Sequence, residues 1–90
     1  MKIVKLGASW CAPCKFLSKT LESIKLEEKY KDIEIVELDV DDGEGHIMAR
    51  EMKISSVPTT FFYDDGGNMI TRMTGNKPKT DILKLIDAMI

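Results

Sequence analysis

The chain has 90 residues, of which 13 are basic and 15 acidic, so its net charge at neutral pH is −2. It has neither the basic patch of a nucleic-acid-binding protein nor the roughly 18-residue apolar run of a membrane span, and its N-terminus lacks the apolar stretch of a signal peptide. We therefore expect one cytoplasmic domain over residues 1–90, a monomer that binds neither nucleic acid nor membrane.

The first third of the chain predicts a strand followed by a helix. Met1–Gly7 is short, apolar and rich in β-branched residues, which is typical of a buried strand. Pro13 fits the first turn of a helix, where its missing N–H costs nothing. We predict that this helix spans Ala12–Tyr30. Its expected buried face consists of Phe16, Leu17, Leu21 and Ile24.

The remaining residues predict, in chain order, a strand, a helix, two strands that form a hairpin, and a last helix. Loops are expected at residues 41–45, at 55–58 and at the hairpin turn 64–67. The predicted elements are a strand at Ile33–Val40, a helix at His46–Met52, strands at Thr59–Tyr63 and Asn68–Met73, and a helix that begins at Lys79 or Thr80. The order βαβαββα indicates an α/β fold with a four-stranded mixed sheet and helices on both faces.

The segment Trp10–Lys15 (W-C-A-P-C-K) holds both cysteines and the only tryptophan of the chain. Two thiols separated by two residues can close and reopen a disulfide ring. Cys11 falls at the predicted N-terminus of a helix, where the helix dipole and free N–H groups lower a thiol pKa and make the thiol a nucleophile. In a reducing compartment such a pair is catalytic or metal-binding rather than a structural disulfide. The first hypothesis is therefore thiol–disulfide exchange.

Three signals in this order resemble the thioredoxin family: the W-C-x-P-C-K segment after a strand, Val57-Pro58-Thr59 before a hairpin strand, and Gly75 after the hairpin. The resemblance covers nearly the whole chain and implies a minimal thioredoxin fold, without the strand and helix that ordinary members carry first. It departs from the family at Ala12, where most members have Gly, and at Gly7, where many have a second Trp. Because the residues between the cysteines tune the reduction potential, Ala12 leaves that potential open.

The resemblance also implies a role for each residue of the site. Cys11 would attack a substrate disulfide, and Cys14 would resolve the mixed disulfide. Pro13 would shape the ring, and Trp10 would shield it and offer an apolar rim to protein substrates. No bound cofactor is expected, only a reversible Cys11–Cys14 disulfide.

The same resemblance implies a substrate-binding surface beside the thiols. Pro58 would follow a cis peptide bond and pack against the disulfide, and the backbone of Val57 would pair with an extended substrate. Gly75 would let the partner's backbone approach closely. The implied partners are disulfide-containing proteins and a thioredoxin reductase or an equivalent electron donor, within the electron transport of cell redox homeostasis.

The most unusual departure is a reversal of charge below the cysteines. Six residues before the first Cys, thioredoxins usually have a buried Asp, and here that position is Lys5. On the next strand they tend to have a Lys, and here the aligned residue is Glu37. We hypothesise that Lys5 and Glu37 pair beneath the disulfide as a proton relay with inverted roles. The alternative is that Lys5 extends to the surface.

Two other functions are compatible with the same residues. A glutaredoxin-like enzyme that uses glutathione would share Val57-Pro58, and a non-enzymatic accessory subunit would need only the fold. Zinc usually takes four ligands, whereas the chain offers two Cys and His46, which we expect at the surface. The acidic run from Asp39 to Glu44 has glycine and glutamate at the wrong offsets for an EF-hand, so we interpret it as a solvated loop.

Overall fold

The computed structural model describes all residues 1–90 and has the predicted βαβαββα order. The elements are β1 (Lys2–Gly7), α1 (Ala12–Lys25), the short 3₁₀ helix η1 (Glu28–Tyr30), β2 (Glu34–Asp39), α2 (Gly43–Glu51), β3 (Thr59–Tyr63), β4 (Met69–Thr74) and α3 (Lys79–Met89). None of these helices has the length and apolar character that crossing a membrane requires.

The four strands form one mixed sheet in the order β2-β1-β3-β4. β1 pairs in parallel with β2, which the α1 crossover allows, and antiparallel with β3. β3 and β4 form the antiparallel hairpin. The Asp64 carboxylate closes the hairpin turn by accepting hydrogen bonds from the N–H groups of Gly66 and Asn68. The α/β mixed sheet predicted from the sequence is therefore confirmed.

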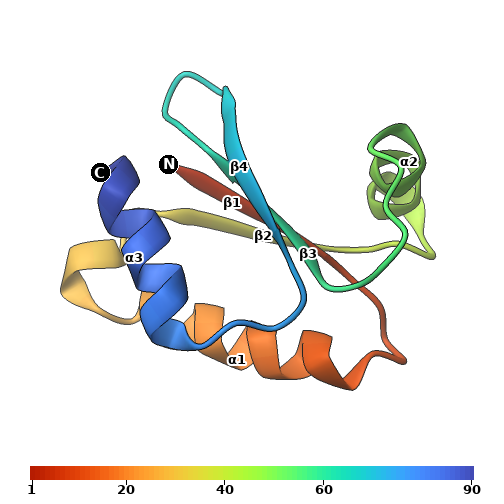
Figure 1. Ribbon diagram of the computed structural model, residues 1–90, viewed down its shortest axis with the longest axis horizontal. Coiled ribbons are helices and arrows are strands. Elements are labelled where there is room, and N and C mark those ends of the chain that lie inside the picture. Colours follow the sequence, from red (N-terminus) through yellow and green to blue (C-terminus); the bar gives the residue numbers. More distant parts are fainter.

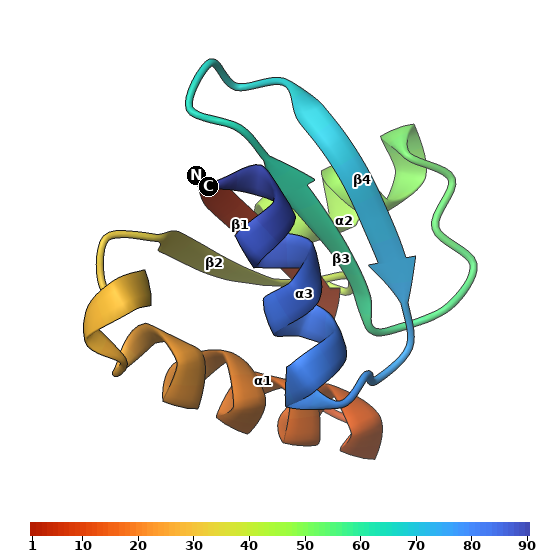
Figure 2. The same cartoon turned by 60° about the vertical axis from the view of Figure 1, so that its left-hand side comes forward.

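Helices α1 and α3 cover one face of the sheet and α2 covers the other (Figures 1 and 2). Because side chains alternate along a strand, Ile3 of β1 packs towards α1 and α3, whereas Val4 packs towards α2. The larger core cluster contains Ile3, Leu17, Leu21, Ile24, Tyr30, Ile33, Phe62, Met73, Ile82 and Ile86. The cysteines belong to neither of these clusters, but to a third one at the N-terminal end of α1.

The first helix is shorter than predicted. It ends at Lys25, and the chain then becomes extended at Glu27 before the single turn of η1. Tyr30 is buried in η1, and its hydroxyl donates a hydrogen bond to Asp87 of α3 at 2.7 Å. A straight continuation of α1 would have carried Tyr30 away from this core, so tertiary burial ends the helix.

The predicted buried face of α1 was also wrong at one position. Leu17, Leu21 and Ile24 are buried, but the Phe16 side chain is 61% exposed. Phe16 precedes Leu17 and is therefore rotated by about 100° from the row of side chains that faces the sheet.

The second helix begins earlier than predicted, at Gly43 instead of His46. Glycine disfavours helix, but a Cβ at Gly45 would lie 2.0 Å from the backbone oxygen of Asp39. The close packing of α2 against the end of β2 therefore requires glycine inside the helix. His46 is exposed, and its Nδ1 lies 3.1 Å from the Val40 carbonyl oxygen.

Candidate active site

Cys11 and Cys14 form a disulfide at the N-terminus of α1, the red-orange end of that helix in Figure 1. Cys11 is the N-cap residue, and Cys14 lies in the first turn. Both sulfur-bearing residues are buried, Cys14 slightly more than Cys11, whereas Ala12 and Pro13 between them are exposed. The ring is thus held between the core and the solvent.

The Cys11 sulfur occupies the position of a helix-capping acceptor. It accepts a hydrogen bond from the Cys14 backbone N–H at 3.2 Å. A thiolate at this position gains from the same N–H and from the positive end of the helix dipole. The geometry therefore favours a nucleophilic Cys11 once the disulfide is reduced.

Trp10 lies at the surface beside the ring. Its side chain is 70% exposed, and its indole Nε1–H donates a hydrogen bond to the Asp41 carboxylate at 2.8 Å. This bond joins the loop before α1 to the loop before α2. An exposed aromatic ring fixed in this way offers an apolar contact surface next to the thiols.

The segment Val57-Pro58 contacts the site from the loop between α2 and β3. The peptide bond between the two residues is cis, and the Val57 carbonyl oxygen lies 3.8 Å from the Cys11 sulfur. Gly75 has φ +84°, and its N–H donates to the Pro58 carbonyl oxygen at 2.8 Å. Val57, Pro58 and Gly75 are thus brought together beside Cys11.

Lys5 and Glu37 form an ion pair below the disulfide, with 2.7 Å between Lys5 Nζ and Glu37 Oε1. Lys5 does not reach the surface, since only 5% of the residue is exposed. Its ammonium also donates to the Cys14 carbonyl oxygen at 3.0 Å and to the Ser18 hydroxyl. Because β1 and β2 place Lys5 opposite Glu37, the strand register determines this pair.

The environment of Glu37 acts on its acidity in two directions. Partial burial raises the pKa of the carboxyl group, but hydrogen bonds from Lys5 and Ser18 and the charge of Lys5 together lower it below the ordinary value. Glu37 is therefore ionised over the neutral pH range.

Two residues of this site, Ser18 and Asp41, were not predicted as site residues from the sequence. Ser18 lies one helical turn after Cys14 and reaches both the Cys14 carbonyl oxygen and Glu37. Its spacing of four residues from Cys14 was a usable signal, since such residues share a helix face. Asp41 gave no signal, because its bond to Trp10 joins residues 31 apart in the chain.

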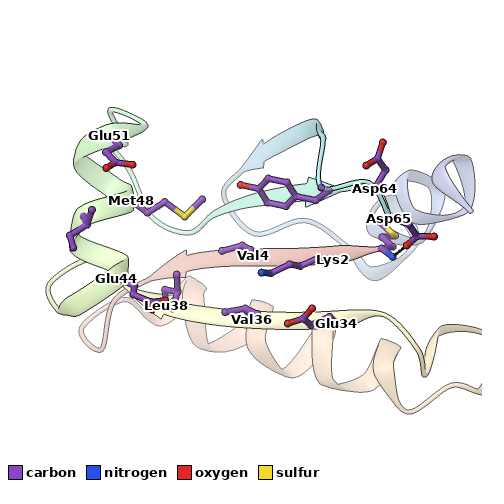
Figure 3. A pocket seen from close by; sticks show the side chains of 14 residues that line it. Lys2, Val4, Glu34, Val36, Leu38, Glu44, Met48, Glu51, Asp64 and Asp65 are labelled. Atoms are coloured by element: carbon purple, nitrogen blue, oxygen red, sulfur yellow. Dashed lines mark hydrogen bonds and ion pairs between the residues drawn. The ribbon is translucent and has the colours of Figure 1, made fainter.

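Two hollows lie on opposite faces of the sheet. A small crevice of about 240 Å³ is lined by Lys5, Cys14, Ser18 and Glu37, among others, and opens the region below the disulfide to solvent. A larger groove of about 690 Å³ lies between the sheet and α2, with Val4, Val36 and Met48 along it and acidic side chains such as Glu34 and Glu51 at its margin (Figure 3). No cysteine lines the larger groove, whereas Cys14 lines the small crevice.

Comparisons with known proteins agree with this geometry. A profile of the thioredoxin family matches residues 1–88, which include both cysteines and the whole sheet. Thioredoxin-2 of Saccharomyces cerevisiae is 38% identical over 76 residues, which make up 84% of this chain and 68% of that protein. The bifunctional thioredoxin reductase/thioredoxin of Mycobacterium leprae is 35% identical over 82 residues, 91% of this chain and 17% of that longer protein.

A solved structure shows the same fold. The crystal structure of oxidised mitochondrial thioredoxin 3 from Saccharomyces cerevisiae matches with a TM-score of 0.80. The match covers 97% of this chain and 76% of the yeast chain at 29% identity.

Proposed function

Since the chain belongs to the thioredoxin family and is a thiol–disulfide oxidoreductase, we propose that it reduces disulfide bonds in other proteins, with Cys11 as the attacking thiol and Cys14 as the resolving thiol. The observation that carries the proposal is the position of the Cys11 sulfur as the N-terminal cap of α1, where it accepts the Cys14 N–H. This position stabilises a thiolate at Cys11 rather than at Cys14.

In this proposal the substrate lies against the surface formed by Trp10, Val57 and Gly75, and the buried Pro58 supports this surface from below. The Cys11 thiolate attacks one sulfur of the substrate disulfide and releases the other as a thiol. Val57 lies beside Cys11 with an intermediate exposure, so an extended substrate segment can pair with its backbone. The exposed Trp10 ring adds apolar contact area.

The electron donor in this proposal is a thioredoxin reductase or an equivalent enzyme. The relative from Mycobacterium leprae, which joins a thioredoxin reductase and a thioredoxin in one chain, supports this pairing. The proposal includes a monomer that works in a reducing compartment, the cytoplasm, where a dithiol is regenerated after each turnover.

A coupled reduction assay tests this function. We expect the protein to reduce insulin disulfides when it is supplied with NADPH and a thioredoxin reductase, and not when it is supplied with glutathione and glutathione reductase. Cys11→Ser should abolish turnover, whereas Cys14→Ser should trap mixed disulfides with substrate proteins, because the resolving thiol is missing. Activity that depends on glutathione alone would instead support a glutaredoxin-like enzyme.

The reduction potential is a second readout of the same proposal. A titration of Trp10 fluorescence in dithiothreitol and glutathione buffers should give a potential on the order of −250 mV or lower, as for a cytosolic reductant. A value of roughly −200 mV or higher would contradict it. If the protein with both Cys11→Ser and Cys14→Ser retains its biological effect, the chain acts as an accessory subunit.

A further inference from the structure

The ammonium of Lys5 is held in a fixed position directly below the cysteines. A charged lysine has three N–H donors, and the three acceptors within reach are the Cys14 carbonyl oxygen, Ser18 Oγ and Glu37 Oε1. With 5% of the residue exposed, the charge is less screened by water than that of a lysine on the surface. A fixed charge in such a site acts strongly on any group beside it that changes its own charge.

The cysteine beside this charge is Cys14, whose backbone carbonyl oxygen accepts a hydrogen bond from the Lys5 ammonium at 3.0 Å. A Cβ placed on Gly7 would lie 3.2 Å from Lys5 Cε and 3.3 Å from Cys14 Sγ. The end of the Lys5 side chain and the Cys14 sulfur therefore lie around the same point, in space left free by the glycine. A larger residue at position 7 would crowd both groups.

Glu37 is the counter-ion of Lys5. Its side chain is 39% exposed at the mouth of the crevice, and its pKa is lowered by the contacts with Lys5 and Ser18, which outweigh its burial. A carboxyl group with a lowered pKa holds a proton weakly at neutral pH. In the arrangement proposed below, Glu37 keeps Lys5 in place through the ion pair, and the thiol proton passes to solvent through the crevice.

Other groups around Cys14 do not replace this charge. Lys15 of α1 and Asp39 of β2 line the same crevice, but both are more exposed than Lys5, and the Asp39 carboxylate accepts the Asp41 N–H at 2.8 Å. From β3, the residue opposite Lys5 is Thr60, an uncharged residue whose buried hydroxyl makes no hydrogen bond. Cys11 is the remaining titratable group and is bonded to Cys14 in the oxidised state.

We propose that Lys5 is a positioning residue that stabilises the thiolate of Cys14 and so promotes the resolving step of disulfide reduction. This inference rests on the proposed function, since it concerns the second half of the same reaction. The residue acts through Cys14 and does not contact the substrate.

In the mixed disulfide, Cys14 loses its thiol proton to water in the crevice, and the thiolate forms beside the Lys5 ammonium. The Cys14 sulfur attacks the Cys11 sulfur, so the Cys11–Cys14 bond forms and the bond between Cys11 and the substrate sulfur breaks. The substrate sulfur leaves with the electron pair and takes up a proton. The dithiol is oxidised to a disulfide while the substrate disulfide is reduced to two thiols.

The decisive experiment is a thiolate titration of Cys14 in the Cys11→Ser protein, followed by absorbance at 240 nm. Lys5→Met removes the charge and keeps much of the side-chain volume, and it should raise the pH midpoint of the thiolate signal by about one to three units. For each unit by which the Cys14 pKa rises, the fraction of Cys14 present as thiolate at neutral pH falls about tenfold, while the thiolate becomes about threefold more nucleophilic. The resolving step at neutral pH should therefore slow about threefold per unit. Single-turnover release of a mixed disulfide in the protein with both cysteines measures that rate.

Lys25→Met is the matched control. Lys25 also donates to a backbone carbonyl oxygen, that of Ile33 at 2.7 Å, but it lies at the far end of α1, so neither readout should change. Lys5→Gln makes the same comparison if Lys5→Met does not fold. An unchanged midpoint and rate in a folded Lys5 variant, while the wild type reduces insulin, would overturn the inference and leave the proposed function intact. A wild type without reductase activity would instead overturn the proposed function.

A Glu37→Gln variant separates the counter-ion from a proton acceptor. The counter-ion role is supported if the pH midpoint of the Cys14 thiolate signal is at or below that of the protein with Glu37, and if the mixed disulfide is resolved at least as fast. Slower resolution with an unshifted midpoint would show that Glu37 accepts the proton, and would overturn the arrangement proposed for this step.

Discussion

At the scale of single residues, the site is determined by a few charges and hydrogen bonds with specific partners. The Cys11 sulfur has a backbone N–H from Cys14, and the Lys5 ammonium has three acceptors. Replacing both members of a buried ion pair by apolar residues is often neutral, whereas removing one partner leaves an uncompensated charge, and in this pair the buried member is Lys5. Removing Glu37 alone should therefore leave the buried Lys5 ammonium without its counter-ion.

The free energy of unfolding at acidic pH should depend on Glu37. Its pKa is lowered in the folded protein, so its contribution to stability is present above the ordinary value of 4.5 and is lost as the pH falls through the folded value. Glu37→Gln should therefore be less stable than the wild type at pH 7, and the difference should shrink towards pH 3. Urea unfolding at several pH values measures this.

Glu34→Gln is the control for that experiment. Glu34 lies on the same strand, but it is exposed and lines the groove on the opposite face of the sheet. Its substitution should leave the pH dependence of stability unchanged. A Glu37→Gln difference that grows as the pH falls would contradict the assignment of Glu37 as an ionised partner of Lys5.

At the scale of elements, the ends of the helices are determined by contacts with other segments. The end of α1 follows from the burial of Tyr30, and the start of α2 follows from its close approach to β2. Gly45 allows that approach, because the atoms that a Cβ would meet are the backbone atoms of Asp39 rather than a side chain that could rotate away. The intrinsic helix propensity of glycine is outweighed here.

Gly45→Ala should destabilise the protein, although alanine is the better helix former. The added methyl group must displace either α2 or the end of β2, and overpacking of this kind costs about 1–3 kcal/mol. Urea denaturation followed by far-UV circular dichroism measures the loss. Glu44→Ala, at the neighbouring exposed position, should stay within about 0.5 kcal/mol of the wild type. Equal stability of the Gly45→Ala protein and the wild type would contradict the close packing of α2 on β2.

At the scale of the whole molecule, the sheet separates two apolar clusters and presents the cysteines at one end. Phe62 packs with α1 and α3, and its neighbour Phe61 packs on the other face. A domain of this size buries a modest share of its surface, so each large core side chain is a considerable part of its stability. The position of the active site depends on the larger cluster, because α1 carries Cys14 and begins directly after Cys11.

Phe62→Ala should therefore destabilise the whole fold, by about 3–5 kcal/mol. Phe16→Ala is the matched control, because Phe16 lies at the surface, and it should change the free energy of unfolding by about 0.5 kcal/mol or less. Both values come from urea denaturation. A similar loss for the two variants would show that the exposed Phe16 contributes to the core after all.

The sequence by itself determined the features that depend on neighbours within a few residues. The short apolar run at Met1–Gly7 predicts a buried strand, the spacing of Cys11 and Cys14 predicts a small ring at a helix start, and residues 64–67 predict the hairpin turn. Each of these follows from local geometry, which is the same in any fold that contains the segment. The order of the elements then restricted the topology to a mixed sheet.

Only the tertiary structure decided the features that join distant segments. The bond between Trp10 and Asp41, the burial of Tyr30 against Asp87 and the close contact of Gly45 with Asp39 bring together residues whose separation carries no local signal. The pairing of Lys5 with Glu37 was a hypothesis from the resemblance, and the register of β1 and β2 together with the burial of Lys5 was needed to show it. The physical reason is that burial, and with it the strength of a charge, is a property of the packed molecule rather than of a segment.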